Sequence, residues 1–141
     1  MQLDGGDRQS AAEMAEQWDQ RVAQKRANVE GHLQRQQPRQ ALLEALHDPP
    51  YAESGASAQA RDQASDLVLK ALGFFKEPEI APAVASLTPD CHNVLMKYIY
   101  NFWERGLPAS VNSRLFTWHA ELVEQSGEGT IVRAIHDWRW P

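Results

Sequence analysis

Proline and glycine divide this sequence into pieces about the length of helices. The breaks carry proline, which lacks a backbone N–H and tends to begin or end a helix: Pro38, Pro49, Pro50, Pro78, Pro89 and Pro108. Between the breaks, apolar residues recur three and four positions apart, which predicts amphipathic helices. No stretch keeps the alternation of a half-buried strand. The pattern therefore predicts an all-α protein.

The first helix differs from the others. Residues 10–37 are mostly polar, and their apolar residues form only a narrow stripe: Met14, Trp18, Val22, Val29 and Leu33. A stripe this narrow indicates a helix that lies on another surface. We therefore expect two parts, an N-terminal polar helical arm at residues 1–37 that faces a partner, and a helical core domain at residues 38–141.

Core helices show wider apolar faces. One carries Ala64, Leu67, Val68, Ala71, Leu72 and Phe75, and Lys76 is expected at its end. Another begins at Thr88, which can cap the helix, followed by proline at the first helical position. Thr130 is expected to cap the last helix. In total we predict about seven helices packed antiparallel in an irregular, superhelix-like array, because the connections are short and no repeat period is visible.

Charge and composition exclude several classes of protein. The formal net charge is −5, which argues against binding a phosphate backbone, so no nucleic acid is expected. No apolar run approaches the roughly 20 residues of a membrane helix, and no membrane insertion is expected. Cys91 is the only cysteine and cannot form an internal disulfide. A cytoplasmic protein fits these features.

Reactive groups are not arranged for catalysis. Cys91 and His92 are neighbours on a predicted helix, where adjacent side chains point about 100° apart and cannot activate one another. The five histidines show no metal-ligand spacing, and Gly127 and Gly129 lack the lysine of a phosphate-binding loop. We therefore expect neither an enzyme nor a cofactor or metal.

Aromatic residues are dense in one predicted helix. Tyr98 and Phe102 fall on its apolar face, whereas Tyr100 and Trp103 point elsewhere. Either a second helix covers Tyr100 and Trp103, or they face a partner protein, where tyrosine and tryptophan are enriched.

Residues 95–100, Leu-Met-Lys-Tyr-Ile-Tyr, closely resemble a motif of the subunit 5 family, the smallest subunit of the actin-related protein 2/3 complex. Other segments resemble the family in the same order, from about Pro38 to Arg139: residues 41–50, 68–72 with 75–76, 80–87, 115–119 and 127–133. Two regions depart from the family. Residues 10–37 are predicted to be a helix where the family usually has an extended acidic arm, and residues 137–141 stand where the family has a basic tail.

The resemblance implies a structural subunit without a catalytic role. Such a subunit supports nucleation of branched actin filaments by tethering an actin-related protein to the body of the complex. Its expected partners are the other subunits, including an actin-related protein, with actin contacted indirectly within the actin cytoskeleton. The alternative is a free-standing helical adaptor that binds peptides. We expect partner contacts at Trp18, Val22, Lys97, Tyr100 and Trp140.

Overall fold

The computed structural model describes residues 3–137 and 139–141. Seven α-helices and one short 3-10 turn, Ala52–Ser54, make up this part of the chain, and none of its residues forms a strand. The prediction of an all-α protein is confirmed. The helices are α1 (Leu3–Gln34), α2 (Pro38–Leu46), α3 (Ala58–Leu72), α4 (Glu77–Ala85), α5 (Pro89–Glu104), α6 (Ala109–Ser126) and α7 (Gly129–His136).

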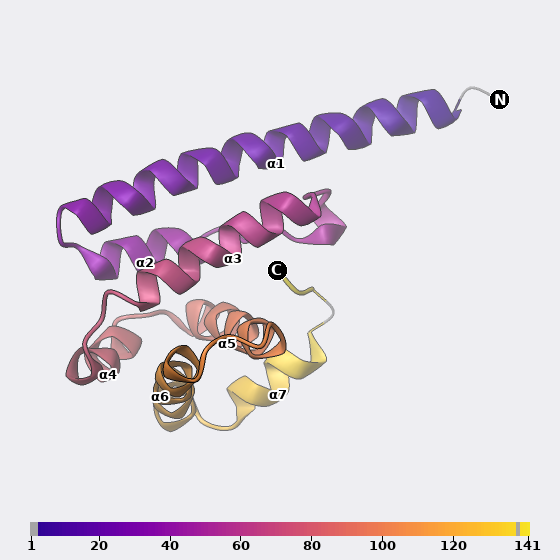
Figure 1. Ribbon diagram of the computed structural model, residues 1–141. Helices are drawn as coiled ribbons and strands as arrows, with labels where there is room; N and C mark the ends of the chain where they lie inside the picture. The colour runs from indigo at the N-terminus through magenta and orange to yellow at the C-terminus, as the bar shows by residue number, and fades with distance from the viewer. Residues whose placement is uncertain (1–2, 138) are drawn as a thin grey trace.

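The helices form two groups. α1, α2 and α3 lie alongside one another, and α4 to α7 gather on the other side of α2 and α3 (Figure 1). The packing order differs from the chain order, since α4 packs mainly against α6. The first turns of α1 extend past the rest of the molecule, which leaves residues 10–13 exposed.

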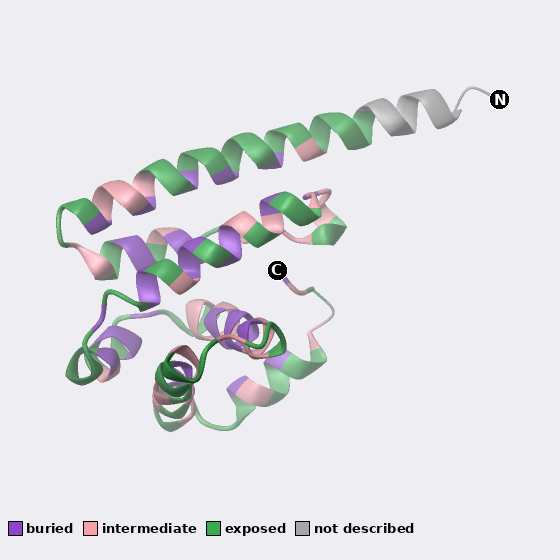
Figure 2. Ribbon diagram, viewed as in Figure 1, coloured by how far each residue is buried: buried purple, intermediate pink, exposed green. Residues whose placement is uncertain are grey.

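The main hydrophobic core lies where the two groups meet (Figure 2). α5 supplies its centre with five fully buried side chains, namely Leu95, Met96, Tyr98, Ile99 and Phe102. Phe75 and Trp118 meet edge to face with ring centroids 5.2 Å apart, a favoured aromatic geometry. Burial of large side chains of this kind contributes about 1.5–3 kcal/mol each, so this contact zone is the main source of stability.

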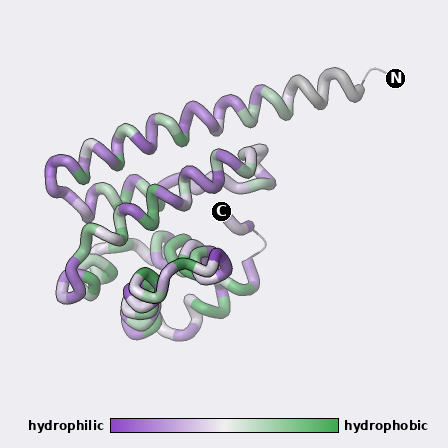
Figure 3. Tube along the Cα trace, viewed as in Figure 1, coloured by the Kyte–Doolittle hydropathy of each residue, from purple (hydrophilic) through white to green (hydrophobic). Residues whose placement is uncertain are grey.

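The polar helix α1 ends earlier than predicted. It stops at Gln34 and not at Gln37, because Gln36 takes a left-handed conformation with φ of 56°. The amides of Gln36 and Gln37 then bond back to the carbonyls of Leu33 and His32 at 3.0 and 2.8 Å, which satisfies the helix end. Hydrophilic residues cover most of α1 (Figure 3), while Val29 and Leu33 at its end join the main core.

The end of α3 also corrects a prediction. The helix stops at Leu72, and Lys76 is instead the N-cap residue of α4, where its amide donates to Glu79 Oε1 at 2.7 Å. Phe75 is buried as predicted, but from a turn and not from the helix. Helical spacing placed its side chain correctly, because the turn returns it to the same core.

Two predicted helix starts had different outcomes. Thr88 caps α5 as predicted, and its hydroxyl oxygen accepts from the Cys91 amide at 3.3 Å. The prediction for Thr130 was wrong, because α7 already begins at Gly129. Thr130 is instead fully buried, and its hydroxyl oxygen accepts from Arg133 Nη2 at 3.2 Å.

Candidate protein interface

Trp18 and Val22 lie where α1 packs against α2 and α3. We call this contact, formed by Trp18, Val22 and Lys25, the N-terminal seam. The Trp18 indole N–H donates to the carbonyl of Ser54 at 2.8 Å. Val22 packs in a small buried cluster with two alanines of α3, Ala60 and Ala64. Both predicted contact residues are therefore used in the packing of the chain itself. Their contact with a partner stays a prediction.

Lys25 was missed in the sequence and is central to the seam. Its side chain is buried, and Nζ donates to the carbonyls of His47, Asp48 and Ala45 at 2.6, 3.3 and 3.5 Å. The ammonium thus acts as hydrogen-bond donor to carbonyls at the C-terminal end of α2, which have no partner within the helix. Burial away from water lowers the pKa of Lys25 to about 8, although the negative charge of Asp48 acts to raise it. One signal was available, since the apolar stripe skips a turn where Lys25 lies.

Lys97 is also buried, in a set of contacts that we call the C-terminal clasp: Lys97, Asp137, Arg139 and Trp140. Lys97 is only 1% exposed and forms an ion pair with Asp137. Its Nζ also donates to the carbonyl of Arg139 at 2.8 Å, and the Trp140 indole N–H donates to the carbonyl of Asp137 at 2.9 Å. The hydrogen bond from Lys97 holds the pKa of Asp137 below its usual value. For Lys97 and Trp140, partner contact also stays a prediction.

Tyr100 belongs to an aromatic patch formed with Trp103, Phe116 and His119. The Trp103 ring lies 4.7 Å from Phe116 and 5.2 Å from His119, and the Tyr100 hydroxyl lies 3.1 Å from His119 Nε2. α6 supplies Phe116 and His119, so a second helix packs against Tyr100 and Trp103, but both side chains stay partly exposed. Contact of Tyr100 with a partner therefore stays a prediction. Burial lowers the pKa of His119, which favours the neutral ring.

Exposed apolar side chains indicate where a partner could bind. Phe116 is 60% exposed on α6, and Val132 and Ile135 are 54% and 58% exposed on α7. These three side chains lie on two neighbouring helices, and apolar surface left uncovered on a folded chain is a candidate for contact with a partner. Helical spacing places Val132 and Ile135 among the apolar residues of the last helix, but it does not show that they stay uncovered.

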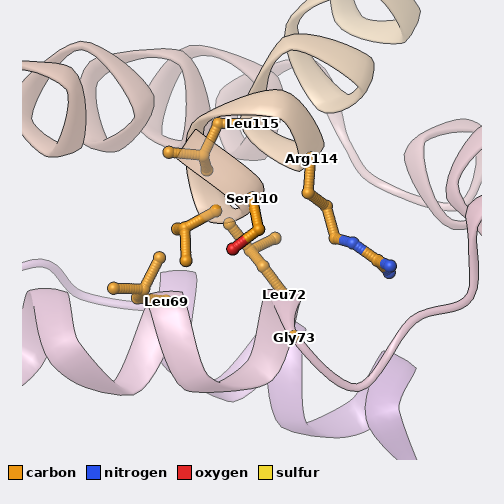
Figure 4. A pocket seen from close by; sticks show the side chains of 7 residues that line it. Leu69, Leu72, Gly73, Ser110, Arg114 and Leu115 are labelled. Carbon is orange, nitrogen blue, oxygen red and sulfur yellow. The ribbon is translucent and has the colours of Figure 1, made fainter. Parts of the chain in front are cut away.

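A pocket of about 330 Å³ lies between the end of α3 and the start of α6 (Figure 4). Leu69, Leu72 and Leu115 form its apolar walls, and the Ser110 hydroxyl lies among them. Arg114 stands at one side, where its guanidinium donates to the carbonyl of Phe75. A pocket of this size has room for one large apolar side chain.

The histidine next to Cys91 is engaged in other contacts. His92 uses both ring nitrogens away from Cys91, with Nε2 2.8 Å from the Val84 carbonyl oxygen and Nδ1 2.5 Å from the Ser126 hydroxyl. Among residues 3–137 and 139–141, no three histidine, cysteine or acidic side chains are grouped to hold a metal ion. No described helix combines the length and apolarity needed to cross a membrane.

These observations define an all-helical protein whose prominent surface features are apolar and aromatic contact areas. The sequence profile of the family described as ARP2/3 complex 16 kDa subunit (p16-Arc) matches residues 3–140. This chain belongs to that family.

Curated relatives agree with the family assignment. Actin-related protein 2/3 complex subunit 5 of Dictyostelium discoideum is 37% identical over 118 residues, which cover 82% of this chain and 80% of that protein. Subunit 5-C of Xenopus laevis is 41% identical over 95 residues, 67% of this chain and 61% of that protein. The human subunit 5-like protein is 33% identical over 109 residues, 77% of this chain and 69% of that protein.

Proposed function

We propose that this chain is a structural subunit of the actin-related protein 2/3 complex. In that role it supports nucleation of branched actin filaments by tethering an actin-related protein to the body of the complex. The match of the family profile to residues 3–140 carries the proposal, because it spans nearly the whole chain. The exposed apolar side chains of α6 and α7 support it, since a subunit needs surfaces that become covered on assembly.

The proposal assigns the chain a role through contacts and not through a reaction. Its partners are the other subunits, including an actin-related protein, and actin is reached through them. The chain would then be associated with the actin cytoskeleton in the cytoplasm. The arm at residues 1–37 and the residues Trp18, Val22, Lys97, Tyr100 and Trp140 belong to this proposal as candidate contacts.

Affinity purification of the tagged chain from its native cells tests membership of the complex. We expect both actin-related proteins and the remaining subunits in equal amounts with the tagged chain. Recovery of the chain alone, as a well-behaved monomer, would instead favour the free-standing adaptor.

The tethering role needs a separate experiment. The first turns of α1 extend past the other helices, so a chain that begins at Met14 keeps the seam at Trp18 and Lys25. We expect reconstituted complexes with this shortened chain to assemble, but to lose an actin-related protein on gel filtration and to form fewer branches. A full-length variant with Leu43→Ala, on an exposed face of α2, is the control. Unchanged branching by the shortened chain would contradict tethering through the arm.

A further inference from the structure

An apolar groove lies between α6 and α7, next to the aromatic patch. It has a volume of about 550 Å³, and its apolar lining consists of Ala120, Val123, Ile131 and Val132. α7 anchors one wall through Thr130 and Ala134, which are fully buried. Its opposite face carries Val132 and Ile135, both more than half exposed. The groove is therefore held by a packed helix and leaves apolar surface uncovered.

The charges of the groove have one sign. Glu124 and Glu128 line it, and both side chains are exposed. His119 lines it as well, and burial lowers the pKa of that histidine, which favours the neutral ring. No lysine or arginine is among the described lining residues, and Arg133 on α7 donates to Thr130. The lining of the groove is thus mostly apolar, and its charged residues are acidic.

We infer that the α6–α7 groove binds a basic amphipathic helix of another subunit, an inference that rests on the proposed function. A groove between two helices is a common receptor for a third helix, which lays its apolar face into it. In this arrangement apolar side chains of the partner cover Val123 and Val132. Its lysine or arginine side chains face Glu124 and Glu128, where opposite charges fix the orientation of the two helices.

A second copy of this chain fits the groove poorly. A symmetric contact through the groove would bring two copies of Glu124 and Glu128 together, and like charges across an interface oppose binding. The net charge of −5 adds to this repulsion. A partner of opposite charge is the occupant that the groove selects.

The apolar surface continues beyond the groove. His119 lines the groove and also contacts Trp103 of the aromatic patch, with ring centroids 5.2 Å apart. Phe116 lies one helical turn before Ala120 on α6 and is 60% exposed. A partner helix that fills the groove can therefore extend over Phe116 and cover more apolar surface than the groove alone offers.

Peptide binding to the full chain tests the inference directly. Two designed helical peptides share the same leucine positions, and one carries lysines on its flanks where the other carries glutamates. Fluorescence anisotropy should show the lysine peptide binding at least about tenfold more tightly. Glu124→Lys combined with Glu128→Lys should reverse this preference, although the variant still has a net negative charge. Equal binding of both peptides, or an unreversed preference, would overturn the inference.

Val132→Asp provides the apolar test. The side chain is exposed, so the variant should keep its helix content by circular dichroism and its melting temperature. It should bind the lysine peptide about tenfold more weakly, whereas the matched control Leu43→Asp on α2 should not. Equal effects of the two substitutions would show that the peptide binds elsewhere.

Photo-crosslinking inside the complex separates the inference from the proposed function. A photoreactive residue at position 132 of the co-expressed chain should label a basic helical segment of another subunit, and one at Leu43 should not. Assembly with labelling of an acidic or non-helical segment, or with no labelling, would overturn the groove assignment and leave the proposed function intact. Failure to assemble would count against the proposed function, and the peptide measurements alone would then decide the groove.

Discussion

The N-terminal seam and the C-terminal clasp each bury a lysine, but they stabilise its charge differently. In the seam, the ammonium of Lys25 is held by three backbone carbonyls at the end of α2. In the clasp, the ammonium of Lys97 has the carboxylate of Asp137 as well as the carbonyl of Arg139. Each region also contains a tryptophan whose indole N–H donates to a backbone carbonyl.

This difference shows how one residue type can serve two structural purposes. Neutral carbonyls solvate a buried ammonium only in part, so desolvation dominates and the pKa of Lys25 falls to about 8. A carboxylate supplies a full opposite charge, which ties the end of the chain to α5 through one ionic contact. The seam therefore depends on pH in the alkaline range, and the clasp depends on its ion pair.

Removal of the carboxylate should break the clasp and give the largest effect. Asp137→Asn leaves the buried ammonium of Lys97 without its counter-charge, and we expect the free energy of unfolding to fall by about 3 kcal/mol. Urea unfolding monitored by circular dichroism measures the change, with Glu13→Gln on the exposed face of α1 as the control. A loss no greater than that of the control would show that the ion pair does not hold the tail.

Alkaline pH should act on the seam. Between pH 8 and 10 the unfolded chain keeps the proton on Lys25, whereas the folded chain, with a pKa of about 8, releases it. The unfolded state then binds more protons, so this lysine makes stability rise with pH in that window. Relative to Lys25→Met, the wild-type chain should gain about 2 kcal/mol from pH 8 to pH 10.

The exposed Lys70→Met provides the control for the pH experiment. Its unfolding free energy should follow that of the wild-type chain across the window. Parallel curves for the wild-type chain and Lys25→Met would contradict the assignment of the alkaline effect to the seam.

The tryptophan of the seam offers a finer test. Trp18→Phe keeps an aromatic ring and removes the hydrogen bond to the Ser54 carbonyl, in a site with little access to water. We expect a loss of about 1 kcal/mol, together with faster hydrogen exchange of the α1 amides. Unchanged exchange in α1 would show that the indole hydrogen bond does not hold the helix on the core.

The tryptophan of the clasp should matter less. Trp140→Phe removes the equivalent hydrogen bond to the Asp137 carbonyl, but this site is only partly buried and water can replace the indole. We expect a loss of about 0.5 kcal/mol in urea unfolding. A larger loss than that of Trp18→Phe would reverse the ranking of the two regions.

Prediction from the sequence succeeded where local chemistry decides the outcome. The prolines, the hydroxyl of Thr88 and the three- and four-residue spacings identified the helices of the core, including the central positions of α5. It failed at Thr130, where a plausible cap residue is used inside the helix for packing. It also extended α3 through Lys76, because residues of the following turn continue the apolar spacing.

The candidate interface was less accessible to the same reasoning. Trp18, Val22 and Lys97 are predicted partner contacts, and the structure buries all three within the chain, so their contact with a partner stays a prediction. The exposure of Phe116 and Val132 could not be predicted, because a helical pattern shows which face is apolar and not whether another helix covers it.

The sequence by itself determined the helical class, most of the helix positions and the resemblance to the subunit 5 family. Those features depend on neighbouring residues, whose turn chemistry and spacing are visible along the chain. Only the tertiary structure decided the fate of the two lysines, because their partners lie far away in sequence. Lys25 needs carbonyls 20 or more residues further along, and Lys97 needs a carboxylate 40 residues further along. Such contacts form only when the helices pack, so local patterns carry no record of them.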